Sequence, residues 1–295
     1  MRNYISETDL IINPNGSIYH LGIKPNDLAK TVILVGDPER VPKVSAFFDQ
    51  IHFKHRNREL HTHTGTFGNE AISVLSTGMG TDNIDIVMNE VDALFNIDFE
   101  TRQPKEKITK LRFIRLGTSG SLHADISIDS ILVSGAAVGF DSLANYYKTI
   151  GLSSEHKKFH EDLKEKLVEI FENTPTYFVP CSDELYNRFS PHFANGITAT
   201  CPGFYGPQGR SVRIELSDLG NGLLEFLQNY KYGSKRITNF EMETAGIYLM
   251  ANLLGHQAIS LNAILANRVT KQFSTQADVT INKMVGQALA LLFPN

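Results

Sequence analysis

The chain has 295 residues, 42% of them hydrophobic and 20% charged, which is the composition of an ordinary globular protein. Its 28 basic and 32 acidic residues give a net charge of −4, so no basic footprint for nucleic acid or an anionic membrane is present. The two cysteines, Cys181 and Cys201, are too few for a disulfide framework and lack metal-ligand spacing. We therefore expect small-molecule substrates, with neither nucleic acid nor a membrane as a partner.

The chain shows no targeting segment. Residues 1–16 lack the basic-then-apolar pattern of a signal peptide. No apolar run approaches the length of a membrane span. The expected location is the cytoplasm.

Short β-branched runs alternate with helical periodicity along the chain. In the first half we predict a helix over 84–95 and strands at 31–36, 71–80, 111–120 and 130–139. In the second half we predict a C-terminal helix, helices over 154–173 and within 240–255, and strands at 176–179, 194–201 and 258–268. This alternation indicates a layered α/β fold, and without internal repeats or low-complexity linkers we expect residues 1–295 to form one domain.

Three predicted strands run into polar, glycine-rich turns: GDPERV (36–41), STGMG (76–80) and RLGTSG (115–120). Such turns expose backbone N–H groups and let an anion approach closely. Arg40, Arg115 and the hydroxyl of Thr118 add the donors that a phosphate needs. Each turn alone is as well explained as a tight connection with a surface arginine, but the carboxyl ends of strands are where α/β sheets bind ligands.

The segment GFYGPQGR (203–210) is a loop, because three glycines and a proline interrupt regular structure. Gln208 can both donate and accept on one planar face, and Arg210 can only donate. This pair suits a planar ligand with an acceptor–donor–acceptor edge, such as O2, N3–H and O4 of uracil. A solvated turn is the alternative that composition allows.

Glu241 and Glu243 flank Met242 near the start of a predicted helix. A glutamate at a helix N-terminus can simply complement the helix dipole. Alternatively, one carboxylate accepts hydrogen bonds from a vicinal diol such as ribose. The pattern alone leaves both interpretations open.

Taken together, these motifs resemble the nucleoside phosphorylase superfamily, and most closely the uridine phosphorylases. The resemblance runs from YHLGIKPNDL (19–28) to ILANR (264–268) and includes RELHT (58–62) and FEMETA (240–245) between them. It implies a three-layer αβα sandwich around a central mixed β-sheet. It also implies a pentosyltransferase that carries out reversible phosphorolysis of uridine to uracil and ribose 1-phosphate, a step of pyrimidine salvage.

The resemblance assigns roles to individual residues. It implies that phosphate binds to Gly36, Arg40, Arg115, Thr118 and, from a neighbouring subunit, Arg58. Ribose would contact Met242, Glu243 and His20, the last of these across the same subunit interface. The uracil pocket would be formed by Phe204, Gln208 and Arg210, and the catalytic groups would be Arg115, Gln208, Arg210 and Glu243. A homodimer is then the minimal active unit, and relatives commonly assemble into hexamers.

Two departures bear on the substrate. Purine-cleaving relatives place an acidic aspartate where this chain has Asn267, which argues against a purine. Nucleosidase relatives use water and lack the three phosphate arginines that are present here. The alternatives that remain open are a nucleoside phosphorylase of other or broad base specificity, including purines, a nucleoside hydrolase, and a non-catalytic nucleoside-binding protein of the same fold.

We expect no cofactor, since inorganic phosphate is a co-substrate. Asn83 stands where uridine phosphorylases usually have a serine, within a monovalent cation site that also uses the residue matching Glu59, so a potassium site is doubtful. The histidines within residues 52–63 lack a helical i, i+4 pair and lie beside arginines. They predict no zinc site.

Overall fold

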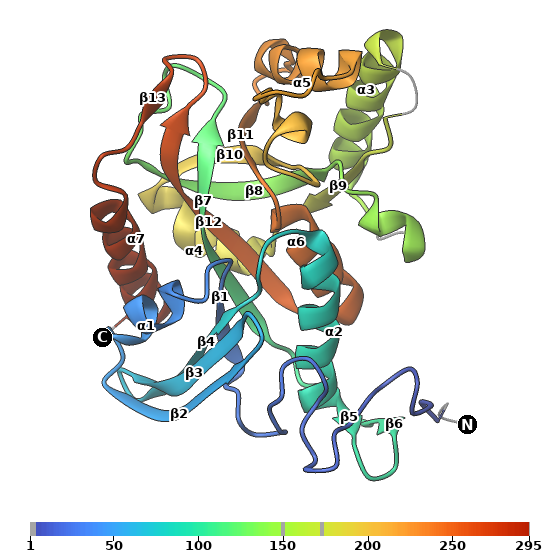
Figure 1. The fold of residues 1–295 in the computed structure, drawn as a ribbon, viewed down its shortest axis with the longest axis vertical. Helices are drawn as coiled ribbons and strands as arrows, with labels where there is room; N and C mark the ends of the chain where they lie inside the picture. The colour runs from blue at the N-terminus through green and yellow to red at the C-terminus, as the bar shows by residue number, and fades with distance from the viewer. Residues whose placement is uncertain (1–3, 149–150, 172–173, 295) are drawn as a thin grey trace.

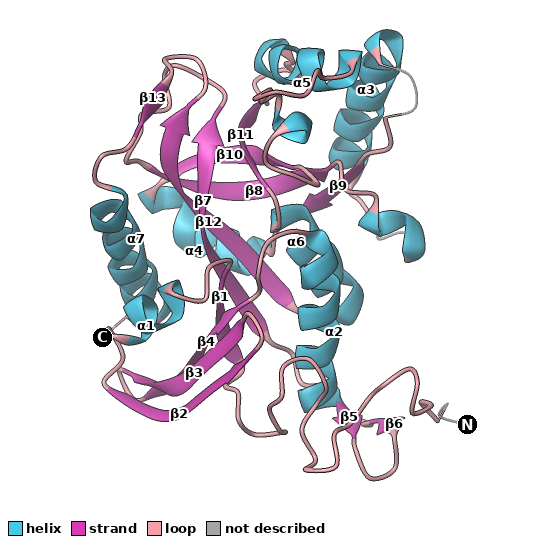
Figure 2. Ribbon diagram, viewed as in Figure 1, coloured by secondary structure: helices cyan, strands magenta, loops and turns pink. Residues whose placement is uncertain are grey.

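The computed structural model describes residues 4–148, 151–171 and 174–294 (Figure 1). Its centre is an 11-stranded mixed sheet, flanked by helices (Figure 2). The strands of this sheet are β1 (Thr31–Val35), β2 (Gln50–Asn57), β3 (Leu60–Phe67), β4 (Glu70–Ser76), β7 (Arg112–Ser121), β8 (Ile131–Gly139), β9 (Tyr177–Pro180), β10 (Ala194–Thr200), β11 (Ile237–Glu241), β12 (Gln257–Asn267) and β13 (Gln272–Phe273). A separate two-stranded sheet contains β5 (Ile97–Asp98) and β6 (Gln103–Pro104).

Five strands of the large sheet close on themselves. β7 pairs in parallel with β12, β12 antiparallel with β8, and β8 in parallel with β10. β10 then pairs in parallel with β11, which returns antiparallel to β7. We call these five strands the ring. β1, β4, β3 and β2 extend from β7 as an open wing of the same sheet.

Helices cover the sheet from several sides. α2 (Thr81–Asn96) and α6 (Thr244–Leu254) pack together on one side, and α1 (Arg40–Ser45) and α7 (Ala277–Leu292) lie on the opposite side (Figure 1). The remaining helices are α3 (Ser154–Ile170), α4 (Asp183–Phe189), α5 (Asp218–Asn229) and the short 3₁₀ turns η1 (Leu143–Tyr146), η2 (Ser190–His192) and η3 (Gly206–Gln208). The mixed sheet with flanking helices confirms the predicted fold class.

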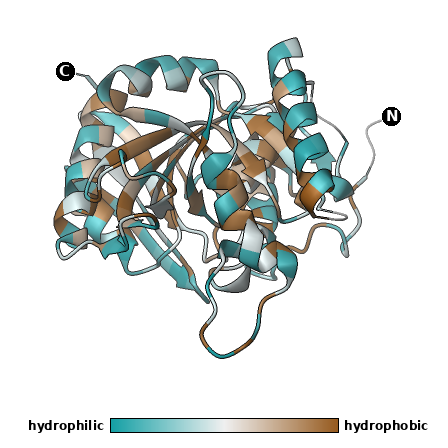
Figure 3. Cartoon of the chain, turned by 90° about the horizontal axis from the view of Figure 1, so that it is seen from above, coloured by the Kyte–Doolittle hydropathy of each residue, from teal (hydrophilic) through white to brown (hydrophobic). Residues whose placement is uncertain are grey.

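The core follows the hydropathy pattern of the sequence. Figure 3 shows apolar strands in the interior and polar faces on the outer helices. The apolar stripe predicted for the helix over 84–95 is buried in α2, because its members recur every three or four residues. Among the described residues, no helix is long and apolar enough to cross a membrane.

Most predicted elements are present. The helices α1, α4 and α5 and the short strands β5, β6 and β13 were not predicted, and three further differences follow. The β2–β3 hairpin was not predicted, because β2 alternates between exposed and half-buried residues without an apolar face. Phe240 and Glu241 belong to the end of β11, and the helix begins only at Thr244. The predicted helix 154–173 ends at Ile170, and positions 172–173 lie outside the described residues. That residues 1–295 form one domain stays a prediction.

Candidate functional site

A cavity of about 1020 Å³ opens where the carboxyl ends of six strands meet. The turns after β1 and β4 supply one end of its lining, and the loop after β10 supplies the other. β7, β11 and β12 contribute the wall between them. The convergence that the glycine-rich turns suggested is therefore present in the fold.

Arg40 stands at the first of these ends, beside Gly36. Its Nη1 donates to the Leu116 carbonyl at 3.3 Å, and this bond holds the side chain against β7. Burial lowers the pKa of Arg40, and the nearby carboxylate of Asp37 opposes that shift. A guanidinium that is partly desolvated and only weakly paired is a strong attractor for an anion.

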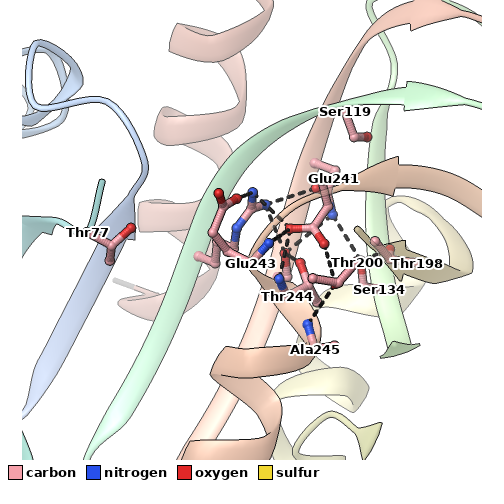
Figure 4. Close-up of polar contacts among 12 residues, drawn as sticks. Thr77, Ser119, Ser134, Thr198, Thr200, Glu241, Glu243, Thr244 and Ala245 are labelled. Carbon is pink, nitrogen blue, oxygen red and sulfur yellow. Dashed lines mark hydrogen bonds and ion pairs between the residues drawn. The ribbon is translucent and has the colours of Figure 1, made fainter. Parts of the chain in front are cut away.

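Arg115 is buried at the centre of the site and bonded to two carboxylates, those of Glu241 and Glu243, which Figure 4 labels. Its Nη2 lies 2.6 Å from Glu243 Oε2 and 3.0 Å from Glu241 Oε2. Burial alone would lower the pKa of Arg115, but the charges of Glu241 and Glu243 raise it. Burial also raises the pKa of Glu243, against the pull of Arg115. The three side chains form a buried cluster with one positive and two potentially negative groups.

Glycines make room for this cluster. A Cβ on Gly117 would lie 1.8 Å from Arg115 Nη1, so no larger residue fits under the guanidinium. Gly80 has a φ of 94°, which favours glycine, and its N–H donates to Glu243 Oε1 at 2.8 Å. Glycine is therefore needed in RLGTSG at Gly117, where space is lacking, and in STGMG at Gly80, where the backbone conformation favours it.

The loop between β10 and α5 carries the amide and guanidinium pair. Arg210 Nη1 donates to Gln208 Oε1 and to the Phe204 carbonyl, both at 2.7 Å, and its guanidinium lies 3.8 Å from the centre of the Phe204 ring. Gln208 Nε2 donates to the Gly203 carbonyl at 3.1 Å. Burial, together with the charge of Arg268, lowers the pKa of Arg210 to about 10. The pair is therefore ordered within its own loop.

The end of β12 fixes this loop from the other side. Arg268 Nη1 donates to the Gln208 carbonyl at 3.0 Å. Asn267 is buried, and its Nδ2 donates to the carbonyls of His123 and Ile126, both at 2.9 Å. Its Oδ1 accepts from the N–H groups of the two residues that start the next turn, Val269 and Thr270. Asn267 thus joins the segment 123–126 to the turn after β12 by hydrogen bonds.

Two predicted residues do not line this cavity. His20 is held by Glu90, whose Oε1 lies 2.6 Å from His20 Nδ1, and Arg58 lies 5.5 Å from the centre of the Tyr19 ring. The Tyr19 ring also contacts His20 edge to face, at 4.7 Å between ring centres. His20 and Arg58 therefore gather around one tyrosine and are not among the residues that line the cavity of their own chain.

Asn83 and Glu59 are the two residues that the doubtful potassium site would involve. Asn83 Nδ2 donates to the Met79 carbonyl at 3.1 Å. Glu59 and Asn83 both lie close to Gly78. That no potassium ion binds here stays a prediction, and the proposed mechanism uses none.

The cavity brings together nine of the predicted residues: Gly36, Arg40, Arg115, Thr118, Phe204, Gln208, Arg210, Met242 and Glu243. Their individual roles stay predictions. Sequence reasoning missed Ser260 and Asn262, which bond Arg115 Nη1 at 3.4 and 3.0 Å. Their signal was two polar residues at alternating positions inside the apolar strand AISLNAIL.

The model of the phosphorylase superfamily matches residues 30–292 of the chain. The chain belongs to this superfamily. Within it, a uridine phosphorylase of Thermococcus kodakarensis is 31% identical over 94% of this chain and 87% of its own length. A purine nucleoside phosphorylase of the DeoD type from Oceanobacillus iheyensis is 26% identical over 92% of this chain and 97% of its own.

The superfamily resemblance extends to three dimensions. The crystal structure of a Trypanosoma brucei nucleoside phosphorylase, described as having uridine phosphorylase activity, superimposes with a TM-score of 0.89 at 29% identity. The match covers 97% of this chain and 100% of that one. As a member of the phosphorylase superfamily with such relatives, the protein is a pentosyltransferase that acts on small molecules. The relatives include both a uridine phosphorylase and a purine nucleoside phosphorylase, so these comparisons do not identify the base that this protein releases.

Proposed function

We propose that the protein catalyses the reversible phosphorolysis of uridine to uracil and ribose 1-phosphate, a step of pyrimidine salvage. The observation that carries this proposal is the Gln208–Arg210 pair in the same cavity as Arg40 and Arg115. Arginines suit the phosphate, and the amide with its guanidinium suits the edge of uracil. Glu243 lies beside Arg115 and is available to ribose hydroxyls.

The proposed reaction displaces uracil from C1′ by phosphate without a covalent enzyme intermediate. Arg40, Thr118 and Arg115 would hold the phosphate under the sugar, where it is oriented for attack and lies beside the developing positive charge. Glu243 would hold the 2′ and 3′ hydroxyls, so that binding energy from ribose aligns the reacting carbon. The roles of these residues follow from the family resemblance and from their grouping in the cavity.

The leaving base needs stabilisation because negative charge collects on O2 and O4 of uracil. Gln208 Oε1 has a second lone pair for N3–H, and the second hydrogen of its Nε2 can reach a carbonyl oxygen. Arg210 has further N–H groups beyond those given to Phe204 and Gln208. We propose that this pair stabilises the departing anion, with the charge-assisted bond from Arg210 as the larger contribution.

Charge counting favours a shared site. Within one chain, Arg115 is already bonded to the carboxylates of Glu241 and Glu243, so Arg40 is the main cation that its phosphate turns offer to a phosphate dianion. Arg58 from a second copy would supply a further cation, and the neighbouring His20 would reach the ribose 5′-hydroxyl. We therefore propose a homodimer as the minimal active unit, with a hexamer as a possible larger assembly.

A phosphorylase of purine or broad base specificity is the second candidate, favoured by the similarity to a DeoD-type enzyme. Against it, Asn267 occupies the position of the purine-protonating aspartate and its amide is engaged with four backbone groups. A non-catalytic nucleoside-binding protein and a nucleoside hydrolase are less consistent with the arginines of the cavity.

The test is base release by the purified protein from uridine, thymidine and inosine, each with and without inorganic phosphate. The proposal expects release of uracil from uridine only when phosphate is present, and no release from inosine. Release without phosphate would make the protein a hydrolase. Preferential cleavage of inosine would overturn the role given to Gln208 and Arg210.

A further inference from the structure

The ring has a polar interior that the proposed mechanism does not use. Alternate residues of its strands direct hydroxyl and amide groups inward: Ser134, Thr198, Asn239, Ser260 and Asn262, each 0% exposed. Figure 4 labels two of these residues, Ser134 and Thr198, near Glu241 and Glu243. Buried polar groups persist only when their hydrogen bonds are satisfied, so the pattern of donors and acceptors here is constrained.

The constraint begins at Arg115. Its Nη1 donates to Asn262 Oδ1 at 3.0 Å, and a guanidinium can only donate. The oxygen of the Asn262 amide must therefore face Arg115, and its Nδ2 must face away. Nδ2 donates to Ser134 Oγ at 2.9 Å.

The direction set by Arg115 passes along the interior. Among the described residues, Thr198 Oγ1, 2.5 Å away, is the one remaining partner of Ser134 Oγ, so the hydrogen of Ser134 is satisfied only if it is donated to Thr198. Thr198 in turn donates to Asn239 Oδ1 at 3.0 Å. The Asn239 amide is thereby oriented, and its Nδ2 donates to Ser119 Oγ at 3.0 Å. We call this series of hydrogen bonds, from Arg115 to Ser119, the relay. Each hydroxyl has one hydrogen, so no hydrogen bond of the relay can reverse its direction.

Ser119 is where the relay reaches the cavity. It lines the cavity, and its oxygen accepts from Asn239, but no other hydrogen bond joins its side chain to the described residues. Its hydrogen is therefore left for an acceptor in the cavity. Ser119 lies on β7 between Arg115 and Gly120. Arg115 is at the end of the cavity proposed to bind phosphate. Gly120 lies near Arg268, which holds the loop proposed to bind the base.

We propose that Ser119 is a nucleoside-binding residue whose hydroxyl donates a hydrogen bond to an acceptor oxygen at the junction of ribose and base. Asn262 and Asn239 are positioning residues that fix the direction of this donor. The inference rests on the proposed function only in that the ligand is a nucleoside. It gives the buried relay a task in substrate binding in addition to its task in the core.

The experiment measures kcat and KM for nucleoside and for phosphate in four variants, together with their melting temperatures. Ser119→Ala removes the donor and should lower kcat/KM for the nucleoside roughly ten- to a hundred-fold while leaving the KM for phosphate unchanged. Ser119→Thr keeps the hydroxyl and should retain most of the activity. Asn239→Asp replaces the donating nitrogen with an acceptor, which takes the Ser119 hydrogen out of the cavity and should reproduce the loss.

The double variant Ser119→Ala/Asn239→Asp should then be no worse in kcat/KM than Ser119→Ala alone, because its hydroxyl is already gone. Wild-type kcat/KM in Ser119→Ala, additive losses in the double variant, or an equal rise in the KM for phosphate would each overturn the inference. If Asn239→Asp fails to fold, the comparison of Ser119→Ala with Ser119→Thr decides. All variants are assayed with the nucleoside that the wild type cleaves, so cleavage of inosine in place of uridine would refute the proposed function and still test Ser119.

Discussion

Arg115 Nη2 lies 2.6 Å from Glu243 Oε2, so the side chain proposed to bind phosphate is bonded to the one proposed to bind ribose. Glu241 Oε2 lies 3.0 Å from the same nitrogen and also accepts from the N–H of Glu243. Two carboxylates around one buried guanidinium leave an excess of negative charge. Burying such charge is costly, and sites of this kind exchange stability for function.

Replacing Glu243 by glutamine should therefore abolish most turnover without lowering stability. Arg115 keeps Glu241 as a partner, and the excess carboxylate is removed. We expect the melting temperature of the unliganded Glu243→Gln variant to equal or exceed that of the wild type, while kcat/KM for the nucleoside falls by about 10² or more. Thermal melting and steady-state kinetics check this. A large loss of melting temperature would mean that the Arg115–Glu243 bond is a net stabilising contact.

The same variant gives a test of pH dependence. Burial raises the pKa of Glu243, so the folded chain binds this proton more tightly than the unfolded chain does. The contribution of Glu243 to stability is then present at low pH and lost as pH rises from the ordinary glutamate range through the raised pKa. The melting temperature of Glu243→Gln relative to the wild type should rise over that interval. A difference that stays constant with pH would contradict the raised pKa.

The shared site predicts complementation between two inactive variants. Arg58→Ala and Glu243→Gln should each have low activity alone, because each site would need Arg58 from one copy and Glu243 from the other. Co-expressed as a random mixture, half of the dimers would be mixed and each would have one intact site, which restores about a quarter of wild-type activity. Activity assays of tandem-tagged, purified mixed dimers check this. Full activity of Arg58→Ala alone, or an inactive mixed dimer, would rule out exchange of Arg58 between subunits.

Arg210→Ala should reduce kcat for uridine by about 10² to 10³, the usual cost of losing one donor to a developing anion. The loss should be much smaller in KM, because the charge appears only as the base departs. Arg213→Ala is a suitable control, since Arg213 is an exposed arginine nearby that does not line the cavity. Near-normal turnover of uridine by Arg210→Ala would remove the assignment of this loop to the base.

Asn267→Asp should not convert the protein into a purine phosphorylase. The new oxygen would face the carbonyls of His123 and Ile126, which now accept hydrogen bonds from Nδ2, and losing a buried bond costs about 1–3 kcal/mol. We expect a lower melting temperature and no cleavage of inosine. Asn252→Asp is the matched control, because Asn252 also donates to two carbonyls but is exposed, where water can replace it. Purine cleavage by Asn267→Asp would show that the position remains open to the base.

The sequence predicted the parts of the site that depend on local pattern. Glycine-rich turns after apolar strands are visible along the chain, and the fold brings the carboxyl ends of those strands to one place. Gly117 and Gly80 then have steric and conformational roles that explain why those turns contain glycine. The loop with Gln208 was singled out because an amide and a guanidinium two residues apart suit the edge of a planar ligand, and both side chains line the cavity.

The remaining features depend on pairings between distant segments, which periodicity does not contain. Closure of the ring requires β7 to pair with both β12 and β11, and neither pairing leaves a local signature. For the same reason the hydrogen bond between Asn262 and Arg115 could not be predicted from the strand 258–268 alone. The helix within 240–255 was expected to begin near Met242, because the apolar stripe of α6 follows directly after the short strand β11, whereas it begins at Thr244.

The most direct test of the central claim is the stoichiometry of products from uridine and inorganic phosphate, followed by ³¹P NMR together with uracil absorbance. Our account predicts that ribose 1-phosphate and uracil appear in equal amounts, and that added ribose 1-phosphate and uracil regenerate uridine. Uracil formed together with free ribose and unconsumed phosphate would contradict it.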